Sequence, residues 1–172
     1  GISKAKGFLI AKNLKKKNGK VIVLTGDGEL QEGQFWESLI NIPKNISKNL
    51  IIIIDNNKYQ SDLSIEDTSS LGNLKNKLES FNIKTFTCDG NNFDDIKKTF
   101  NKIKYINAPT AIIANTIKGR GVSFMESKPL IKNMYYNYHS GSLKYEEYIN
   151  AKNELIKNFY KIDKDLPVLR LT

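Results

Sequence analysis

Four consecutive isoleucines, Ile51–Ile54, constrain the fold of this 172-residue chain more than any other segment. β-Branched side chains favour strands, and Asp55 closes the run with a polar residue. A strand with no polar position in its interior buries both of its faces, whereas the strands of antiparallel sheets usually keep one face in water. The run therefore predicts a strand inside a parallel sheet that helices cover.

The segments around this strand alternate between helical and extended patterns. We expect helices over 3–17, 33–41, 71–81, 92–105 and 143–159, strands over 21–25, 50–55, 83–87 and 110–115, loops over 56–70 and 116–143, and an extended tail over 163–172. This order is typical of a doubly wound α/β domain, with a parallel sheet and helices on both faces. The length suits one domain, so residues 1–172 are expected to form a single unit.

The net charge of +9 arises from 27 basic and 18 acidic residues. Only Arg120 and Arg170 are arginines, and the lysines are spread along the chain together with 20 Asn and 22 Ile. This bias is typical of an AT-rich coding sequence, so a solvated surface explains the charge better than a polyanion partner does, with a functional basic face as the alternative. We expect no nucleic-acid partner, because the sequence has no aromatic–basic RNA-binding motif.

Other classes of protein are excluded by what the sequence lacks. No apolar run approaches the roughly 18 residues that suggest a membrane span, so no membrane association is expected. The single cysteine, Cys88, excludes an intramolecular disulfide and the Cys/His spacing of a zinc site. Together these features predict a cytoplasmic globular protein.

Two polar motifs follow the first two strands of the predicted sheet. Gly26-Asp27-Gly28 follows the strand over 21–25, and Asp55-Asn56-Asn57 ends the isoleucine strand. Ligands bind at the carboxyl edge of open α/β sheets, where glycines let the backbone approach an anion closely. Carboxylate and amide oxygens are also ligands that suit Mg²⁺. The two motifs therefore predict a site for Mg²⁺ and a diphosphate.

These residues lie in longer segments that resemble the thiamine diphosphate motif of transketolases. Residues 26–37, GDGELQEGQFWE, are similar to the opening half of that motif, and residues 55–58, DNNK, to its closing half. Residues 116–126, TIKGRGVSFME, resemble the loop after the last strand in the N-terminal subunits of split transketolases, and residues 1–11 resemble the helix before the GDG strand. The resemblance spans residues 1 to about 158 and implies the thiamine diphosphate-binding fold.

The resemblance implies a role for each matching residue. Mg²⁺ (or Ca²⁺ or Mn²⁺) would be held by Asp27, Asn57 and the carbonyl of Tyr59, and thiamine diphosphate would contact Gly26, Gly28, Glu29, Asn57, Ile117 and His139. Lys118 and Arg120 would meet a substrate phosphate, and Glu32 and Glu37 would lie at a subunit interface that links paired cofactor sites. Solvated surface side chains are the alternative for these four charged residues.

His139 is the only histidine, and the resemblance implies that it is catalytic and contacts both diphosphate and substrate. Transketolases have a His-Gly-x-x-Pro-like turn here, whereas this chain has His139-Ser140-Gly141-Ser142-Leu143. Tyr59 also departs from the family pattern, because that position is usually aliphatic. Both departures lie near the substrate end of the expected site, and an ordinary surface histidine is the alternative for His139.

The resemblance also implies that the chain lacks the N-terminal part of its domain. A pyrimidine-binding subunit or domain would be its partner, in a homodimer or heterotetramer, and the isolated chain would be inactive. The complete transketolase would transfer a two-carbon ketol unit from a ketose phosphate to an aldose phosphate, as in the pentose phosphate pathway. The alternatives are another thiamine diphosphate enzyme (a deoxyxylulose phosphate synthase or a 2-oxo acid dehydrogenase), a transketolase-like enzyme of unusual-sugar biosynthesis, and a non-catalytic interaction domain with the same fold.

Overall fold

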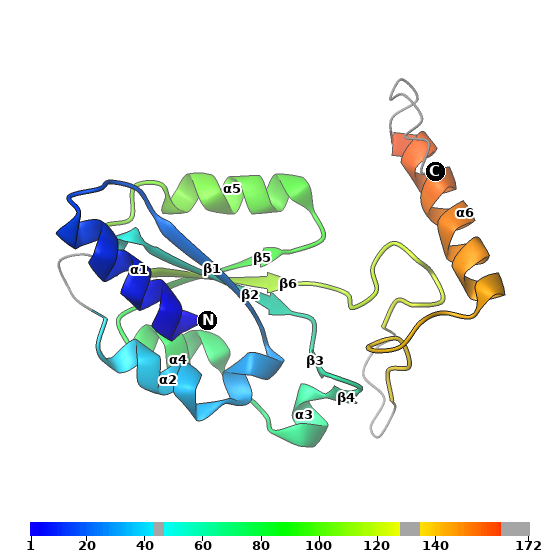
Figure 1. The fold of residues 1–172 in the computed structure, drawn as a ribbon, viewed down its shortest axis with the longest axis horizontal. Coiled ribbons are helices and arrows are strands. Elements are labelled where there is room, and N and C mark those ends of the chain that lie inside the picture. The colour runs from blue at the N-terminus through cyan, green and yellow to red at the C-terminus, as the bar shows by residue number, and fades with distance from the viewer. Residues whose placement is uncertain (43–46, 128–134, 163–172) are drawn as a thin grey trace.

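A computed structural model describes residues 1–42, 47–127 and 135–162 of the chain (Figure 1). Its elements are α1 (Ile2–Leu14), β1 (Val21–Gly26), η1 (Gly28–Gln31), α2 (Gly33–Ile40), η2 (Ser47–Asn49), β2 (Leu50–Asn56), β3 (Tyr59–Gln60), β4 (Leu63–Ser64), α3 (Ile65–Thr68), α4 (Leu74–Ser80), β5 (Lys84–Asp89), α5 (Phe93–Ile103), β6 (Thr110–Asn115) and α6 (Tyr145–Ile162). Every expected helix and strand is present with bounds that differ by a few residues, which confirms the predicted α/β class. The predicted extended tail over 163–172 lies outside the described residues.

Four parallel strands form the main sheet in the order β1-β2-β6-β5. The isoleucine strand β2 is one of the two inner strands, and Ile52 and Ile54 are fully buried. The register pairs Gly26 with Asp55 and Asn56 with Asn115, so the polar residues that end β1, β2 and β6 lie along one edge. The sequence-based prediction of a buried parallel strand is confirmed.

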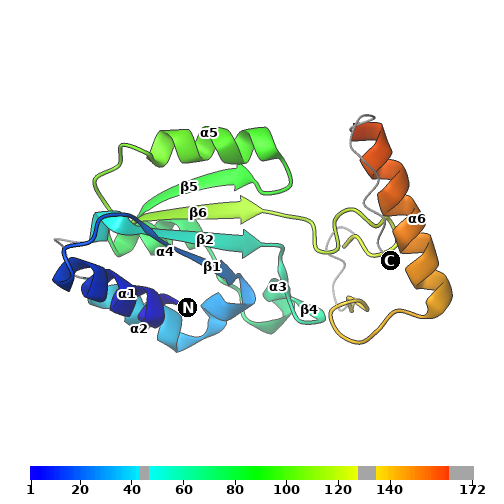
Figure 2. The ribbon, with the colours of Figure 1, turned by 45° about the horizontal axis from the view of Figure 1, so that its top comes forward.

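Two hydrophobic cores cover the two faces of this sheet (Figure 2). On one face α1, α2 and α4 pack against alternate β2 residues such as Ile52 and Ile54. On the other face α5 packs through Ile103 against Ile51 and Ile112. Helices therefore lie on both faces, as the doubly wound interpretation requires.

The edge strand β1 is covered on one face only. Val21 and Val23 pack into the core under α1, while Ile22 and Leu24 point to the opposite face because side chains alternate along a strand. Their exposed fractions are 55% and 69%, since α5 lies over β5 and β6. The described residues thus leave an apolar strip along β1 in water.

The segment after β2 contains more structure than the loop predicted over 56–70. β3 and β4 form a short antiparallel hairpin, and α3 follows directly. The Ser64 hydroxyl caps α3 by accepting a hydrogen bond from the Asp67 amide at 3.0 Å, while the side chains of Tyr59 and Ile65 are buried. Strands of two residues are too short to give a periodic sequence pattern, which explains why the prediction was wrong here.

Helix α6 stands beyond the carboxyl edge of the sheet (Figures 1 and 2). Its Glu154 carboxylate accepts hydrogen bonds from the amide and the hydroxyl of Ser123, at 3.0 and 2.9 Å, which ties the helix to the loop after β6. Among its described side chains only Ala151 is buried. None of the helices in the described residues combines the length and the apolarity that a membrane-spanning segment needs.

Candidate functional site

The two polar motifs meet at the carboxyl edge of the sheet, as their places after adjacent strands predicted. The Asp27 amide donates a hydrogen bond to the Asp55 carbonyl at 3.0 Å, so the turn after β1 is fixed to the end of β2. The Asp27 carboxylate in turn accepts a hydrogen bond from the Lys58 amide at 2.6 Å. The backbone itself therefore places Asp27 over the end of β2.

Asp27 is buried, with 1% of its surface exposed. Its Oδ2 accepts the Lys58 amide, whereas Oδ1 has no hydrogen-bond partner among the residues that the structure describes. Burial raises the pKa of this carboxyl group, and the nearby Asp55 carboxylate adds to the rise, against the lowering effect of the Lys58 and Gly28 amides. A buried, unpaired carboxylate oxygen is costly, and a cation is the partner that would offset the cost.

Asp55 connects the ends of β2 and β6. Its carboxylate accepts hydrogen bonds from the Thr116 hydroxyl and, at 3.4 Å, from the side-chain amide of Asn57. The Asn57 Oδ1 accepts the Tyr59 amide at 2.9 Å, so both ends of the Asn57 side chain are held. The Asn57 oxygen is thereby oriented by its neighbours before any ligand arrives.

These residues fit a divalent cation that a ligand also coordinates. No group of three or more His, Cys, Asp or Glu side chains among the described residues forms a metal cage of its own. Asp27 supplies one unpaired carboxylate oxygen and Asn57 one amide oxygen, which matches the few protein ligands that Mg²⁺ takes when phosphate oxygens and water complete its octahedron.

A hollow of about 480 Å³ is lined by Asn57, whereas Asp27 is not among its lining residues. Its lining brings together Asp55, Asn57, Ile117, Lys118 and His139, from three segments far apart in the sequence. Four of the predicted site residues, Asn57, Ile117, Lys118 and His139, thus share one cavity. Its size suits a small-molecule ligand or part of one.

Lys118 and His139 form a pair on the wall of this hollow. The Lys118 ammonium lies 3.1 Å from His139 Nδ1 and 5.1 Å from the centre of the Tyr136 ring. A lysine ammonium has donors only, so Nδ1 accepts and the other ring nitrogen of His139 is left for a ligand. Burial lowers the pKa of Lys118, and the carboxylates of Asp27, Asp55 and Asp62 oppose this shift.

Gly119 allows the loop after β6 to fold tightly against the aromatic wall. Its φ of +78° lies in the left-handed region, and an added Cβ would collide with the Met125 carbonyl and approach the Tyr136 hydroxyl to 2.6 Å. The Tyr136 ring also packs on Tyr59, with ring centres 5.6 Å apart. Glycine at this position therefore lets the loop hold Lys118 over Tyr136.

Other predicted residues lie outside this hollow. The Glu29 carboxylate accepts hydrogen bonds from the Gly26 amide at 2.9 Å and the Thr25 hydroxyl at 2.8 Å, which lower its pKa and direct it back onto β1. Gly28 begins the turn η1, where an added Cβ would lie 3.0 Å from the Gln60 side chain. Glu32, which directly precedes α2, and Glu37, within α2, are both exposed.

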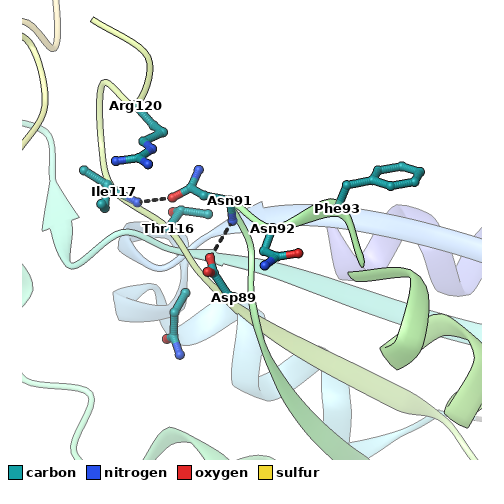
Figure 3. Close-up of a pocket in the computed structure, with 8 residues that line it drawn as sticks. Asp89, Asn91, Asn92, Phe93, Thr116, Ile117 and Arg120 are labelled. Atoms are coloured by element: carbon teal, nitrogen blue, oxygen red, sulfur yellow. Dashed lines mark hydrogen bonds between the residues drawn. The ribbon is translucent and has the colours of Figure 1, made fainter. Parts of the chain in front are cut away.

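A second hollow of about 530 Å³ adjoins the first (Figure 3). It lies between the turn after β5 and the start of the loop after β6, and it shares Asn91, Thr116 and Ile117 with the first hollow. The Ile117 amide donates to the Asn91 side chain at 2.8 Å, and this contact separates the two. Arg120 lines this second hollow and pairs with Glu126 at 3.3 Å.

Comparisons with known proteins agree with this fold. A family model described as 1-deoxy-D-xylulose-5-phosphate synthase matches residues 1–141. The chain belongs to the family of transketolase and 1-deoxy-D-xylulose-5-phosphate synthase N-terminal domains. Transketolases depend in general on thiamine diphosphate.

Relatives of this transketolase domain include individual subunits of larger enzymes. An apulose-4-phosphate transketolase subunit of Actinobacillus succinogenes is 38% identical over 129 residues, which are 75% of this chain and 47% of that protein. The subunit of the same name from Phocaeicola vulgatus is 31% identical over 166 residues, 96% of this chain and 57% of that protein. The solved transketolase of Campylobacter jejuni superposes with a TM-score of 0.65 at 27% identity, covering 73% of this chain and 21% of that one. The chain thus spans about half the length of the curated relatives it matches.

Sequence reasoning missed several residues of this transketolase edge. Asn91 belongs to none of the predicted motifs, although it lines both hollows. Thr116 opens the 116–126 segment but was given no role there, and Tyr136 lies outside the quoted motifs. The roles of both depend on contacts across more than 50 residues. The tyrosine-rich run before His139 was the one available signal, because aromatic side chains rarely gather in a loop without a packing partner.

Proposed function

We propose that the chain is the Mg²⁺- and diphosphate-binding part of a transketolase, which transfers a two-carbon ketol unit from a ketose phosphate to an aldose phosphate. The observation that supports this most strongly is the buried Asp27 Oδ1, which has no partner among the described residues and lies at the edge that carries the family motif. Thiamine diphosphate, when bound, supplies the carbanion chemistry, and the protein supplies position and electrostatics.

Different residues would hold the metal ion and the diphosphate of this cofactor. Asp27, the Asn57 oxygen and the Tyr59 carbonyl would hold the metal, and Gly26 and Gly28 would let the diphosphate approach the backbone. Each of these positions lies at or directly after the end of β1 or β2, so the same edge of the sheet carries both sets. This division explains why the first motif needs glycines on both sides of its carboxylate.

The loop after β6 would serve the anionic end of the cofactor and the substrate. Lys118 donates to His139 Nδ1, so the other imidazole nitrogen can donate a hydrogen bond to a phosphate or a substrate hydroxyl. Ile117 would pack against the cofactor, and Arg120, at the neighbouring hollow, would meet a substrate phosphate. An anion beside Lys118 would also offset the burial that lowers the pKa of this lysine.

Residues 1–172 would form one part of a larger assembly. Two relatives are named as transketolase subunits, which implies a further subunit in those enzymes, and for this chain we infer a pyrimidine-binding partner. Glu32 and Glu37, both exposed, would lie at the interface with a partner and link paired cofactor sites. The isolated chain would bind cofactor without turning over substrate.

Ketol transfer between sugar phosphates tests this function. The chain is assayed with Mg²⁺ and thiamine diphosphate, alone and with a transketolase pyrimidine-binding subunit from the same source. We expect turnover only with the partner, and none with Asp27→Ala in the same mixture. Glu66→Ala, which removes an exposed carboxylate on α3, is the control and should retain turnover. Clear turnover by the isolated chain, or by the Asp27→Ala mixture, would contradict the proposal.

A second candidate reaction is favoured by the description of the matching family model. Formation of 1-deoxy-D-xylulose 5-phosphate would use the same diphosphate edge, so the two reactions are separated by the products of the reconstituted mixture. Relatives named for apulose 4-phosphate and 6-deoxy-6-sulfo-D-fructose show that unusual sugars belong among the substrates to be tried. Product analysis by mass spectrometry distinguishes all of these outcomes.

A further inference from the structure

The second hollow is lined by polar side chains that have no role in the proposed diphosphate site. It lies on the far side of the contact between Asn91 and Ile117, and its lining adds Asp89, Asn92 and Arg120 (Figure 3). Figure 3 shows the Asn91 and Asp89 side chains close to the turn that links β5 to α5, while the Phe93 ring points away from them. The hollow therefore offers a ligand the polar side chains of this turn.

Two amide groups of this turn have an unused donor. The Asn91 oxygen accepts the Ile117 amide at 2.8 Å, and the Asn92 oxygen accepts the amides of Asp94 and Asp95 at 3.0 and 3.1 Å as the cap of α5. Because backbone N–H groups hold both oxygens, the orientation of both side-chain amides is fixed. Neither NH₂ group has a hydrogen-bond partner among the described residues, so both are available to a ligand.

The same hollow also contains a hydrogen-bond acceptor, and its surroundings hold more negative than positive charge. One oxygen of the Asp89 carboxylate accepts the Asn91 amide at 2.9 Å, and no hydrogen bond from the described residues uses the other. Arg120 contributes one positive charge, which Glu126 already pairs with, and Asp89 contributes one negative charge. Asp94 and Asp95, in the first turn of α5, add negative charge close by. This excess of carboxylates disfavours a free anion as the main ligand.

We propose that the second hollow binds the hydroxylated carbon chain of a carbohydrate. Each hydroxyl of a polyol both donates and accepts, which matches the paired donors of Asn91 and Asn92 beside the acceptor of Asp89. The proposal rests on the proposed function, because it gives the sugar chain of the substrate a place next to the diphosphate.

The test uses the ¹⁵N-labelled full chain with ribitol, an open-chain polyol without charge, and with inorganic phosphate as the anionic probe. We expect ribitol to shift the side-chain NH₂ signals of Asn91 and Asn92 in a saturable way. Asn92→Asp keeps the capping oxygen, since Asp is an equally good N-cap, but removes the NH₂ donor. This variant should bind ribitol at least about fivefold more weakly, which corresponds to the loss of one hydrogen bond.

The matched control is Asn73→Asp, the same chemical change at the cap of α4, where the Asn73 oxygen accepts the Asn76 amide at 3.0 Å. It should leave ribitol affinity unchanged. Absence of the shifts, equal affinity in Asn92→Asp, or larger shifts at these signals with phosphate than with ribitol would overturn the proposal. A parallel titration with Mg²⁺ and thiamine diphosphate separates this proposal from the proposed cofactor site. Signal shifts around Asn57 without a response to ribitol would refute only the carbohydrate hollow. A response to ribitol without shifts around Asn57 would refute only the cofactor site.

Discussion

Replacing Asp27 with asparagine should stabilise the metal-free chain while it removes metal binding. The variant keeps an oxygen for the Lys58 amide, which lies 2.6 Å from the native carboxylate. It removes the charge from a residue that is 1% exposed and whose Oδ1 has no partner among the described residues. Asp27 would thus be a residue at which stability is given up for ligand binding.

The magnitude follows from this unpaired oxygen. A buried polar group without a partner costs about 1–3 kcal/mol, and the asparagine NH₂ that takes the place of Oδ1 is unpaired but neutral, so we expect a gain of about 1–2 kcal/mol. For a chain of this size each kcal/mol raises the melting temperature by about 2–4 °C. The expected increase at neutral pH is therefore about 2–8 °C.

The pH dependence of unfolding provides a second readout. Burial raises the pKa of Asp27 in the folded chain above its ordinary value of 3.8, so the folded state binds a proton that the unfolded state releases. This contribution to stability is fully present below the unfolded pKa and is lost as the pH rises through the folded pKa. The Asp27→Asn variant should lack it, so its advantage over the native chain should shrink as the pH is lowered.

Urea and thermal unfolding of the chain, dialysed against a chelator, measure both effects. Glu66→Gln, at an exposed carboxylate on α3, is the control and should change stability by less than about 0.5 kcal/mol. An Asp27→Asn chain that melts at or below the native temperature at pH 7 would refute the reasoning from the unpaired oxygen.

Three further predictions concern the loop after β6 and the cores. Gly119→Ala should lower the free energy of unfolding by at least about 3 kcal/mol in urea, because the new Cβ collides with the Met125 carbonyl. Gly141→Ala, at φ +90° but in open space, should lower it by only about 1–2 kcal/mol. Equal losses in the two variants would contradict the close packing at Gly119. Leu78→Ala, at a fully buried position, should cost about 2–5 kcal/mol, against less than about 0.5 kcal/mol for the exposed Leu14→Ala. Burial, with Asp95 and Asp89 nearby, raises the pKa of the Cys88 thiol, so iodoacetamide at pH 8 should modify the folded chain far more slowly than the chain unfolded in urea. Equal rates in the two states would show that Cys88 is accessible.

The sequence predicted those parts of the site that depend on strand order. A buried isoleucine strand implied a parallel sheet, and two polar motifs after adjacent strands had to meet at one edge, where Asp27 and Asp55 indeed lie in contact. This inference needed only the alternation of helices and strands. The same reasoning explains why the fold class could be predicted from the sequence.

Contacts made by loops could not be predicted in this way. Glu29 lies within the family motif, yet the turn η1 directs its carboxylate back to the Gly26 amide. Lys118 lies over Tyr136 because of a glycine conformation and a chain path that no periodic pattern encodes. The helix expected over 143–159 forms as α6, but only Ala151 is buried among its described side chains, since a helical pattern does not say what will cover a helix.

Mg²⁺-dependent thermal stabilisation by thiamine diphosphate tests the central claim most directly. At a ligand concentration of 100 times the Kd the stabilisation is about 2.7 kcal/mol, or an increase of about 5–10 °C in melting temperature. We predict this increase only when Mg²⁺ and thiamine diphosphate are both present, with or without the partner subunit, and its loss in Asp27→Ala. An increase that persists in Asp27→Ala, or the absence of any increase even with the partner subunit, would contradict the assignment of this sheet edge as a cofactor site.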